Sequence, residues 1–341
     1  MADDFERILI FELNWLGDIL FSFPLLRAIR GRFPKAYIAC AVVPRYRELL
    51  ANNPWVDSVH ALSDNNSIST LKEKLGFAGM MKKEGFDACF LLKPSRTRAV
   101  MASIAGIRER IGFSGKNCPL TRVVDLPKDH VHRADQLLAL AGAVGVESAD
   151  GTYEYFLSNE DKEKGRALLG SLSGRAGTRV ALNPGGNWGA KRWPKENFIE
   201  LGRKLLAVFG EIEIVVTGAS GDVSLAREIV SSIGSPRCYS AAGLTGLNQL
   251  AYIFSVCSLV VSADSGPMHL ASANGAPTIA LFGPTSPEMT GPRGNGRNVV
   301  LRGSVDCRIP CYEENCAKGY ECMRSITAGE VFRAAEKILS E

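Results

Sequence analysis

The chain has 341 residues, about twice the length of an average domain, so its length predicts two domains. The composition, 46% hydrophobic and 22% charged, is ordinary for a globular protein, and 34 glycines and 16 prolines without a short period exclude collagen-like and low-complexity chains. A net charge of +4 is too small for a general nucleic-acid binder.

The predicted elements of the first half alternate between short β-branched runs and amphipathic stretches. Strands are predicted at Arg7–Leu13, Tyr37–Val43, Ser58–Leu62 and Asp87–Leu92. Helices are predicted at Asp18–Arg32, Arg45–Ala51, Leu71–Glu84, Arg96–Ala105 and Ala134–Val144, the last closed by Gly145. This alternation predicts right-handed βαβ units and a parallel sheet.

The alternation of strands and helices stops between Glu147 and Gly177, where we place the domain junction. One helix is predicted within this segment, at Glu160–Leu172. Beyond it the alternation restarts. Strands are predicted at Thr178–Asn183, Glu213–Thr217, Ser258–Ser262 and Thr278–Phe282. Helices are predicted at Lys195–Phe209, Asp222–Ile233, Leu247–Val256, Pro267–Asn274 and Ala328–Leu339, the last opened by a capping box of Thr327 and Glu330. Two consecutive α/β domains favour a ligand beyond the carboxyl ends of the strands.

The N-terminal residues and the lengths of the apolar runs indicate the cellular compartment of the protein. Residues 1–7 carry three acidic side chains, where a secretory signal carries positive charge. Glu12 and Asp18 interrupt the next apolar stretch, and the run Ile253–Ala263 is about half of the ~20 residues that a membrane span needs. We therefore expect a cytoplasmic protein with no transmembrane segment.

Asp18 lies in the loop Asn14–Asp18, which follows the first predicted strand. A carboxylate at this position is suited to accept a proton as a general base. The alternative is that Asp18 caps the helix that follows.

A second loop, Pro184–Pro194, follows the first strand of the second domain. Its glycines allow backbone N–H groups to approach a phosphate, and Lys191 and Arg192 supply positive charge. Its two tryptophans are expected to be exposed. The spacing matches neither a Walker loop nor a dinucleotide fingerprint.

A third loop, Asp264-Ser265-Gly266-Pro267, ends a buried strand and opens a helix, so its free N–H groups and the helix dipole form an anion site. The alternative is that Ser265 merely caps the helix and that His269 is a packed core histidine. The turn Gly283–Thr285 is a further candidate for lining this anion site. Asp222, after another strand, suits a ribose hydroxyl or a helix cap.

Two further features stand apart. Residues 93–133 hold nine Lys or Arg against three acids, which is either a solvated basic face or a surface for an anionic partner. Cys307, Cys311, Cys316 and Cys322 lack the paired spacing of common zinc ribbons. Free cysteines packing a loop, a structural zinc site and a disulfide loop all stay open.

Four segments together resemble glycosyltransferase family 9, the ADP-heptose:lipopolysaccharide heptosyltransferases, and are most like its heptosyltransferase II branch. They are Trp15–Pro24, Lys191–Pro194, Asp264–Ala271 and Phe282–Pro287. The resemblance implies a GT-B fold, in which two Rossmann-like domains face each other across a cleft. It places an acceptor-binding domain at residues 1–155, a nucleotide-sugar domain at 156–325, and a C-terminal helix at 326–341 that packs back toward the first domain.

The resemblance also implies an inverting, metal-independent transfer that needs no cofactor, from ADP-heptose to an anionic lipid A-linked acceptor at the inner membrane surface, without nucleic acid. Asp18 would be the general base, and Lys191 would neutralise charge on the leaving diphosphate. Ser95 and Arg96 would contact the acceptor. The donor-binding positions would be Gly185, Asn187, Lys191, Arg192, Asp222, Leu244, Thr245, Asp264, Ser265, Gly266, Met268 and His269.

The residues support a metal-independent reaction, because no Asp-x-Asp triplet occurs and cations and helix ends are present to stabilise an anion. Another nucleotide sugar or another acceptor stays open within the family. A non-catalytic binding module, in which the basic stretch docks nucleic acid or an anionic surface, is the alternative from another class. A hydride-transferring enzyme is disfavoured, because no Gly-x-Gly-x-x-Gly follows any predicted strand.

Overall fold

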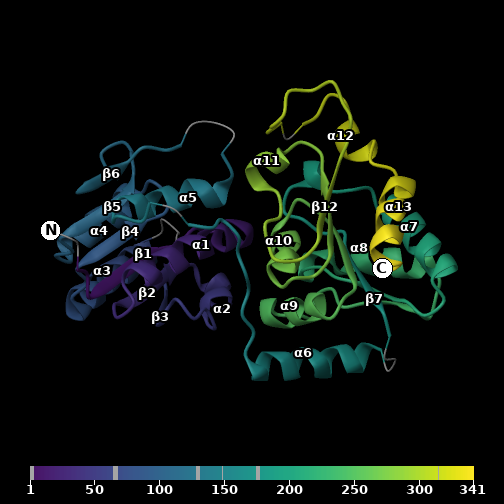
Figure 1. Ribbon diagram of the computed structural model, residues 1–341, viewed down its shortest axis with the longest axis horizontal. Coiled ribbons are helices and arrows are strands. Elements are labelled where there is room, and N and C mark those ends of the chain that lie inside the picture. Colours follow the sequence, from purple (N-terminus) through teal and green to yellow (C-terminus); the bar gives the residue numbers. More distant parts are fainter. Residues whose placement is uncertain (1–3, 64–67, 128–130, 148, 174–176, 314) are drawn as a thin grey trace. The chain divides into compact units, whose positions relative to one another are not determined.

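The computed structural model describes residues 4–63, 68–127, 131–147, 149–173, 177–313 and 315–341. The chain divides into two compact units, Met1–Phe156 and Leu157–Glu341, which are described separately here (Figure 1). Of the segments singled out in the sequence, residues 128–130 of the basic stretch and residues 148 and 174–176 of the junction lie outside the described residues.

The first unit is built on a six-stranded parallel sheet in the order β3-β2-β1-β4-β5-β6. Its strands are β1 (Arg7–Phe11), β2 (Tyr37–Val42), β3 (Ser58–Ala61), β4 (Ala88–Leu91), β5 (Glu109–Phe113) and β6 (Arg122–Val124). Its helices are α1 (Leu16–Arg32), the short α2 (Arg47–Leu50), α3 (Ile68–Glu84), α4 (Arg96–Ile104) and α5 (Arg133–Gly142). Helix α1 packs against α5, and α3 packs against α4.

Buried apolar side chains on both sides of β1 explain this arrangement. Leu9 and Phe11 share one cluster with Phe77 of α3 and Ala99 of α4, and Ile8 is also fully buried. Strands buried on both faces are typical of parallel sheets covered by crossover helices. The strand order reverses between β1 and β4.

The second unit repeats the plan with a parallel sheet in the order β12-β11-β10-β7-β8-β9. Its strands are β7 (Arg179–Asn183), β8 (Glu213–Val216), β9 (Cys238–Ser240), β10 (Leu259–Ala263), β11 (Thr278–Phe282) and β12 (Asn298–Arg302). Its helices are α6 (Asn159–Leu172), α7 (Lys195–Val208), α8 (Val223–Ile233), α9 (Leu247–Ser255), α10 (Gly266–Ala273), α11 (Pro287–Thr290), α12 (Glu321–Arg324) and α13 (Ala328–Leu339).

Helices cover this sheet in two groups. Helix α7 packs against α8 and α13, while α9 packs against α6 and α10 (Figure 1). The last helix, α13, opens with the predicted Thr327–Glu330 capping box and places Val331 and Ala335 in the core of the second unit. Residues 328–339 are therefore a component of that unit, packed on α7 and on β10 and β11.

The predicted parallel α/β class is confirmed, and the predicted elements occur within a few residues of their expected ends. Four strands were not predicted: β5, β6, β9 and β12. Three of them are sheet edges: β6 and β9 have only three residues each, and β12 is partly exposed along its length, although it holds the apolar run Val299–Leu301. No helix among the described residues is both long and apolar enough to cross a membrane.

Candidate functional site

The second sheet reverses its strand order between β7 and β10. In open parallel sheets, ligands bind beyond the carboxyl ends of the strands at such a reversal. The loop after β7 carries Lys191, and the turn after β10 carries Asp264, so two of the predicted loops meet at this point. The second unit therefore has its candidate site at this end of its sheet.

A lysine and an aspartate form an ion pair across the strand reversal between β7 and β10. Nζ of Lys191 lies 2.6 Å from Oδ2 of Asp264. The hydroxyl of Thr285, in the turn after β11, donates to the same oxygen at 2.6 Å. The carboxylate thus joins three loops, while the Lys191 side chain stays 25% exposed and accessible to an anion.

Asp264 is 4% exposed, and its pKa is lowered to about 2. Burial raises this pKa, but the contacts of the carboxylate with His269 and Lys191 lower it by more. Nε2 of His269 is 3.7 Å from Oδ1 of Asp264, and the ring is 3% exposed. His269 is therefore buried, as the core alternative expected, but it lies against the charged centre of the site.

Helix α10 begins directly after this carboxylate. Ser265 is its N-cap residue, as the alternative expected, but its side chain makes no capping hydrogen bond. Its hydroxyl lies 3.2 Å from that of Ser262 instead. Gly266 is half-buried at the first turn, whereas the Met268 side chain is buried with Ala280 and Phe282. Only backbone atoms of Met268 are thus placed to meet a ligand.

The loop after β7 closes tightly on Asp222. A Cβ added to Gly185 would lie 2.3 Å from Oδ2 of Asp222, so any side chain at position 185 would displace this carboxylate. The same oxygen accepts the N–H of Ala219 at 3.0 Å, and Oδ1 lies 3.6 Å from the guanidinium of Arg192. Asp222 makes no side-chain cap to α8. The carboxylate orders the turn after β8, beside an exposed arginine.

Arg192 also stabilises its own loop, because its guanidinium donates to the carbonyl of Gly186 at 2.9 and 2.7 Å. Asn187 at the tip of this loop is exposed. Nζ of Lys191 lies 5.6 Å from the ring centre of Trp188, which stacks on Tyr312 at 6.5 Å. These contacts order the loop, with Lys191 between the Trp188 ring and Asp264 and with Arg192 exposed.

Trp193 corrects the expectation of two exposed tryptophans. It is 2% exposed, donates its indole N–H to the carbonyl of Ile326 at 2.8 Å and packs edge-on against Phe198. Its hydrogen-bond partner lies 133 residues away in the sequence, so the neighbouring polar and charged residues gave no sign that the indole is buried. Trp188 is half-buried.

A buried polar chain beneath these loops was not predicted. The Thr217 hydroxyl donates to Oδ1 of Asn183 at 3.1 Å, and Nδ2 of Asn183 donates to the Ser262 hydroxyl at 3.2 Å. These residues come from the ends of β7, β8 and β10, and each is at most 1% exposed. The chain ties together the strand ends that carry the site.

Leu244 and Thr245 lie in the turn between β9 and α9. The Leu244 side chain is 53% exposed, and its backbone N–H donates to the carbonyl of Ala241 at 3.2 Å. Thr245 is half-buried. An exposed apolar side chain beside the carboxyl end of the sheet is suited to contact the flat face of a base.

Asp18 lies in the first turn of α1, at the carboxyl end of β1 in the first unit, and is half-buried. The helix begins at Leu16, and its N-cap is Trp15, so the alternative that Asp18 caps the helix is wrong. A carboxylate in the first turn of a helix is stabilised by the helix dipole.

Ser95 and Arg96 follow β4, the neighbour of β1 at the reversal of the first sheet. The Ser95 hydroxyl caps α4 by accepting the N–H of Arg98 at 3.4 Å, and Arg96 is exposed. Asp18 and Ser95 thus lie at the starts of the two helices that follow β1 and β4, the strands at the reversal, which is the arrangement expected of a binding surface.

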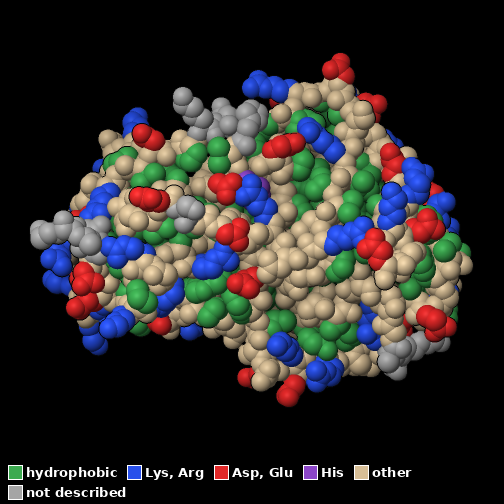
Figure 2. Space-filling model, viewed as in Figure 1, with side chains coloured by type: hydrophobic (Ala, Val, Ile, Leu, Met, Phe, Trp, Pro, Cys, Tyr) green, Lys and Arg blue, Asp and Glu red, His purple; other side chains and the backbone are tan. Residues whose placement is uncertain are grey.

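Fewer of the basic side chains in residues 93–133 are available to a partner than their number suggests. Arg98 is 4% exposed, Arg110 donates to three backbone carbonyls, and Arg122 pairs with Glu109 at 2.9 Å. On the face shown in Figure 2, acidic side chains lie among the basic ones. Exposed cations such as Arg96 and Lys116 remain for an anionic partner.

All nine cysteines are unlinked. Across the part of the chain that the structure describes, no three His, Cys, Asp or Glu side chains are grouped to hold a metal ion. The Cys311 N–H donates to the carbonyl of Pro284 at 2.7 Å, and burial raises the pKa of Cys322. This backbone hydrogen bond ties the loop that carries the four cysteines to the turn after β11.

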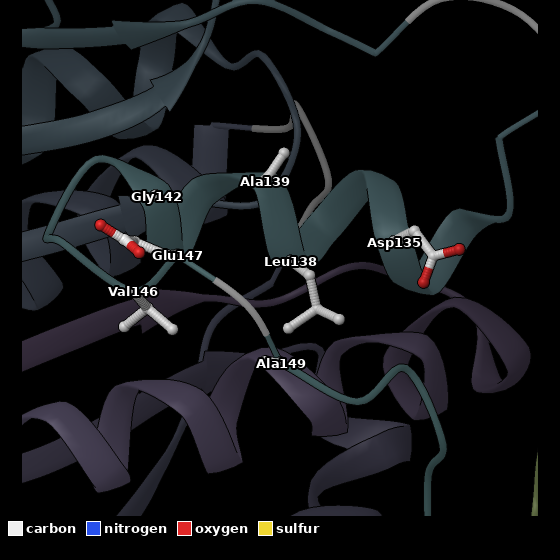
Figure 3. A pocket seen from close by; sticks show the side chains of 7 residues that line it. All are labelled: Asp135, Leu138, Ala139, Gly142, Val146, Glu147 and Ala149. Carbon is white, nitrogen blue, oxygen red and sulfur yellow. The ribbon is translucent and has the colours of Figure 1, made fainter.

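Two surface grooves lie elsewhere. One, of about 310 Å³, runs along α5 and is lined by two carboxylates, Asp135 and Glu147, at opposite ends of a mostly apolar wall (Figure 3). It has no cation in its lining and does not suit an anionic ligand. The other, of about 470 Å³, lies between β12 and α13 and includes Arg297, just before β12. Its lining follows the strand from Arg297 to Leu301 and α13 from Glu330 to Lys337.

Comparison with known proteins gives the same assignment. A model of glycosyltransferase family 9 (heptosyltransferase) matches residues 76–320. Lipopolysaccharide heptosyltransferase 2 of Salmonella typhimurium is 27% identical over 98% of this chain and 99% of its own length. The Escherichia coli protein of that name is 25% identical over 86% of this chain and 87% of its own length.

Solved structures agree. The structure of E. coli ADP-heptose lps heptosyltransferase II has a TM-score of 0.83 and 25% identity, covering 98% of each chain. A family 9 glycosyltransferase from Veillonella parvula has a TM-score of 0.88 at 22% identity, covering 100% of this chain and 99% of its own, and shows the shared fold. With a family match over well more than half of its residues, the chain belongs to glycosyltransferase family 9 and has the GT-B fold of the heptosyltransferases.

Proposed function

We propose that this glycosyltransferase moves heptose from ADP-heptose to the inner core of lipopolysaccharide, with inversion and without a metal ion. The observation that carries the proposal is the Lys191–Asp264 pair at the strand reversal of the second unit, in a chain similar over nearly its full length to lipopolysaccharide heptosyltransferase 2. A lysine at this position is suited to a diphosphate.

The donor would bind the second unit. Lys191, Arg192 and the first turn of α10 at Ser265–Gly266 supply positive charge and free N–H groups for the diphosphate. Asp222 would accept a ribose hydroxyl, Leu244 and Thr245 would contact adenine, and Gly185 would allow the backbone to approach closely. Asp264 and His269 would hold Lys191 in place, and Asn187 would lie at the edge of the donor.

The acceptor would bind the first unit, where Asp18 acts as general base. Asp18 takes the proton of an acceptor hydroxyl, the oxygen forms a bond to the anomeric carbon, and the bond from that carbon to the diphosphate oxygen breaks with its electrons. Attack from the side opposite the leaving ADP inverts the anomeric centre. Lys191 neutralises the charge that develops on the diphosphate.

Ser95 and Arg96 would contact the acidic sugars of a lipid A-linked acceptor. Exposed cations in residues 93–133 would favour an anionic surface, so we place the enzyme in the cytoplasm, peripheral to the inner face of the inner membrane. Transfer from another nucleotide sugar, or to another acceptor, is the second candidate within the family.

The experiment incubates the enzyme with a panel of nucleotide sugars and a lipid acceptor extract, and mass spectrometry identifies the product. ADP-heptose should give a product heavier by one heptose, and Asp18→Asn should lose turnover while still binding ADP-heptose. Asp135→Asn is the matched control, because Asp135 also lies in the first turn of a helix of the first unit. Transfer only from another donor would refute the heptose assignment, and normal turnover of Asp18→Asn would refute the base assignment.

A further inference from the structure

A buried carboxyl group lies behind Asp18 that none of the roles above explains. Glu12 follows β1 directly, and its side chain is 0% exposed. Burying a carboxyl group in a protein core is costly unless its surroundings satisfy it. Its contacts therefore indicate what keeps it there.

The carboxyl group of Glu12 is tied to α1 one turn beyond Asp18. The Ser22 hydroxyl, which also contacts the carbonyl of Ile19, lies 2.9 Å from Oε1 of Glu12, and the N–H of Leu13 donates to Oε2 at 3.3 Å. Ser22 is four residues after Asp18, so both lie on the same face of the helix. The carboxyl group thus anchors the helix segment that presents Asp18.

Arg98 holds the same loop from the other side of the strand reversal. Its NH1 group donates to the backbone carbonyl of Glu12 at 2.7 Å, and its NH2 group donates to Oδ1 of Asn14 at 3.2 Å. Arg98 is 4% exposed and comes from the first turn of α4, two residues beyond Arg96. One guanidinium group therefore joins the proposed base loop to the proposed acceptor loop.

We propose that Glu12 and Arg98 are positioning residues for glycosyl transfer: they fix residues 13–17, so that Asp18 and Arg96 keep their places around the acceptor hydroxyl. This inference rests on the proposed role of Asp18. Neither residue need touch substrate, because both act through the loop that they hold. A planar guanidinium group suits this task, since its rigid fork directs two separate N–H groups to two fixed acceptors, whereas an ammonium group presents its donors from one point on a flexible stem.

The ionisation of Glu12 predicts a pH dependence of turnover that tests this positioning role. The charged and titratable groups that face it are Arg98 on α4 and the Cys40 thiol on β2, which is 4.0 Å from Oε1. Burial and the neighbouring Glu12 raise the pKa of Cys40 well above its usual range, so that the thiol stays protonated. Burial raises the pKa of Glu12 to about 7. Above this pH, the carboxylate accepts both hydrogen bonds and attracts Arg98.

The test measures kcat, KM and ADP-heptose affinity for Arg98→Lys and Glu12→Gln between pH 5.5 and 9. We expect Arg98→Lys to lower kcat by about 100-fold, because a small misplacement of a reacting group has that effect, with the donor Kd within twofold. The kcat of the wild type should rise as the pH passes through about 7, and Glu12→Gln should lose this step.

Arg110→Lys is the matched control, because Arg110 is another arginine of the first unit whose guanidinium donates to backbone carbonyls. It should keep kcat. A normal kcat in Arg98→Lys, an equal loss in Arg110→Lys, or a Glu12→Gln pH profile that superimposes on the wild type would overturn the inference. Asp18→Asn, in the same assay, separates the two proposals: its normal turnover would refute the base assignment itself.

Discussion

The side chain of Lys191 reaches across the strand reversal of the second sheet and places its Nζ 2.6 Å from Oδ2 of Asp264. In the first unit, Arg98 crosses the corresponding reversal to the carbonyl of Glu12 at 2.7 Å. Each unit thus uses a cation from one loop to fix the loop beside it. The two contacts differ in exposure, because Lys191 keeps an exposed side for a ligand whereas Arg98 is buried.

Asp264 should stabilise the second unit against acid. Its pKa is about 2 in the folded chain and 3.8 ordinarily, so its contribution is present above pH 3.8 and is lost as the pH falls through 2. The stability advantage of the wild type over Asp264→Asn should therefore shrink by about 2 kcal/mol between pH 5 and pH 2. Hydrogen exchange of the β7 and β10 amides measures it. A constant difference would mean that the carboxylate is not paired as described.

Gly185→Ala should weaken donor binding without unfolding the protein. The new Cβ would lie 2.3 Å from Oδ2 of Asp222, so the carboxylate must move from the place where it orders the turn after β8. We expect the Kd for ADP to rise about tenfold, the effect of losing roughly one hydrogen bond to a charged group. Isothermal titration calorimetry measures it. Gly186→Ala is the control, because nothing lies within 4 Å of its added Cβ; equal effects would rule out the steric explanation.

The predictable part of the site lies where strongly apolar strands end. The runs that became β7, β10 and β11 are fully or almost fully buried, so their ends, and with them Lys191, Asp264 and Thr285, could be placed on one edge of a sheet. The edge strands β6 and β9 have only three residues each and no such signal.

The contacts beneath the site were not predictable, because they join residues that are distant in the sequence. Arg98 and Glu12 are 86 residues apart, and Asn183 and Ser262 are 79 apart. Each pair meets only after the sheet has set its strand order. A polar residue at a strand end looks the same in sequence whether it faces solvent or a buried partner.

Trp193→Phe should loosen the attachment of the C-terminal helix. The substitution removes the hydrogen bond from the indole N–H to the carbonyl of Ile326, just before α13, and leaves this carbonyl with the longer bond from Nδ2 of Asn197 at 3.3 Å. We expect the free energy of unfolding of the second unit to fall by about 1 kcal/mol, the net contribution of a typical hydrogen bond. Urea titration measures it. Trp188→Phe, at a half-buried position, is the control and should cost less; the reverse order would contradict the proposed anchoring of α13.

Glu12→Gln should become more stabilising, relative to the wild type, as the pH rises. The pKa of Glu12 is about 7 in the folded chain and 4.5 ordinarily, so the folded state binds a proton that the unfolded state has released. Its contribution to stability is therefore fully present below pH 4.5 and is lost as the pH rises through 7. Between pH 4.5 and pH 8, the variant should gain about 3 kcal/mol on the wild type.

Hydrogen exchange of the β1 amides reports this change within the first unit. Glu73→Gln is the control, because its carboxylate is exposed and accepts the N–H of Ser63 on the surface. A similar gain in the control, or no gain in Glu12→Gln, would show that the carboxyl group is not buried. A gain without loss of the pH step in kcat would leave Glu12 buried but without a positioning role, because ionisation would then act on stability alone.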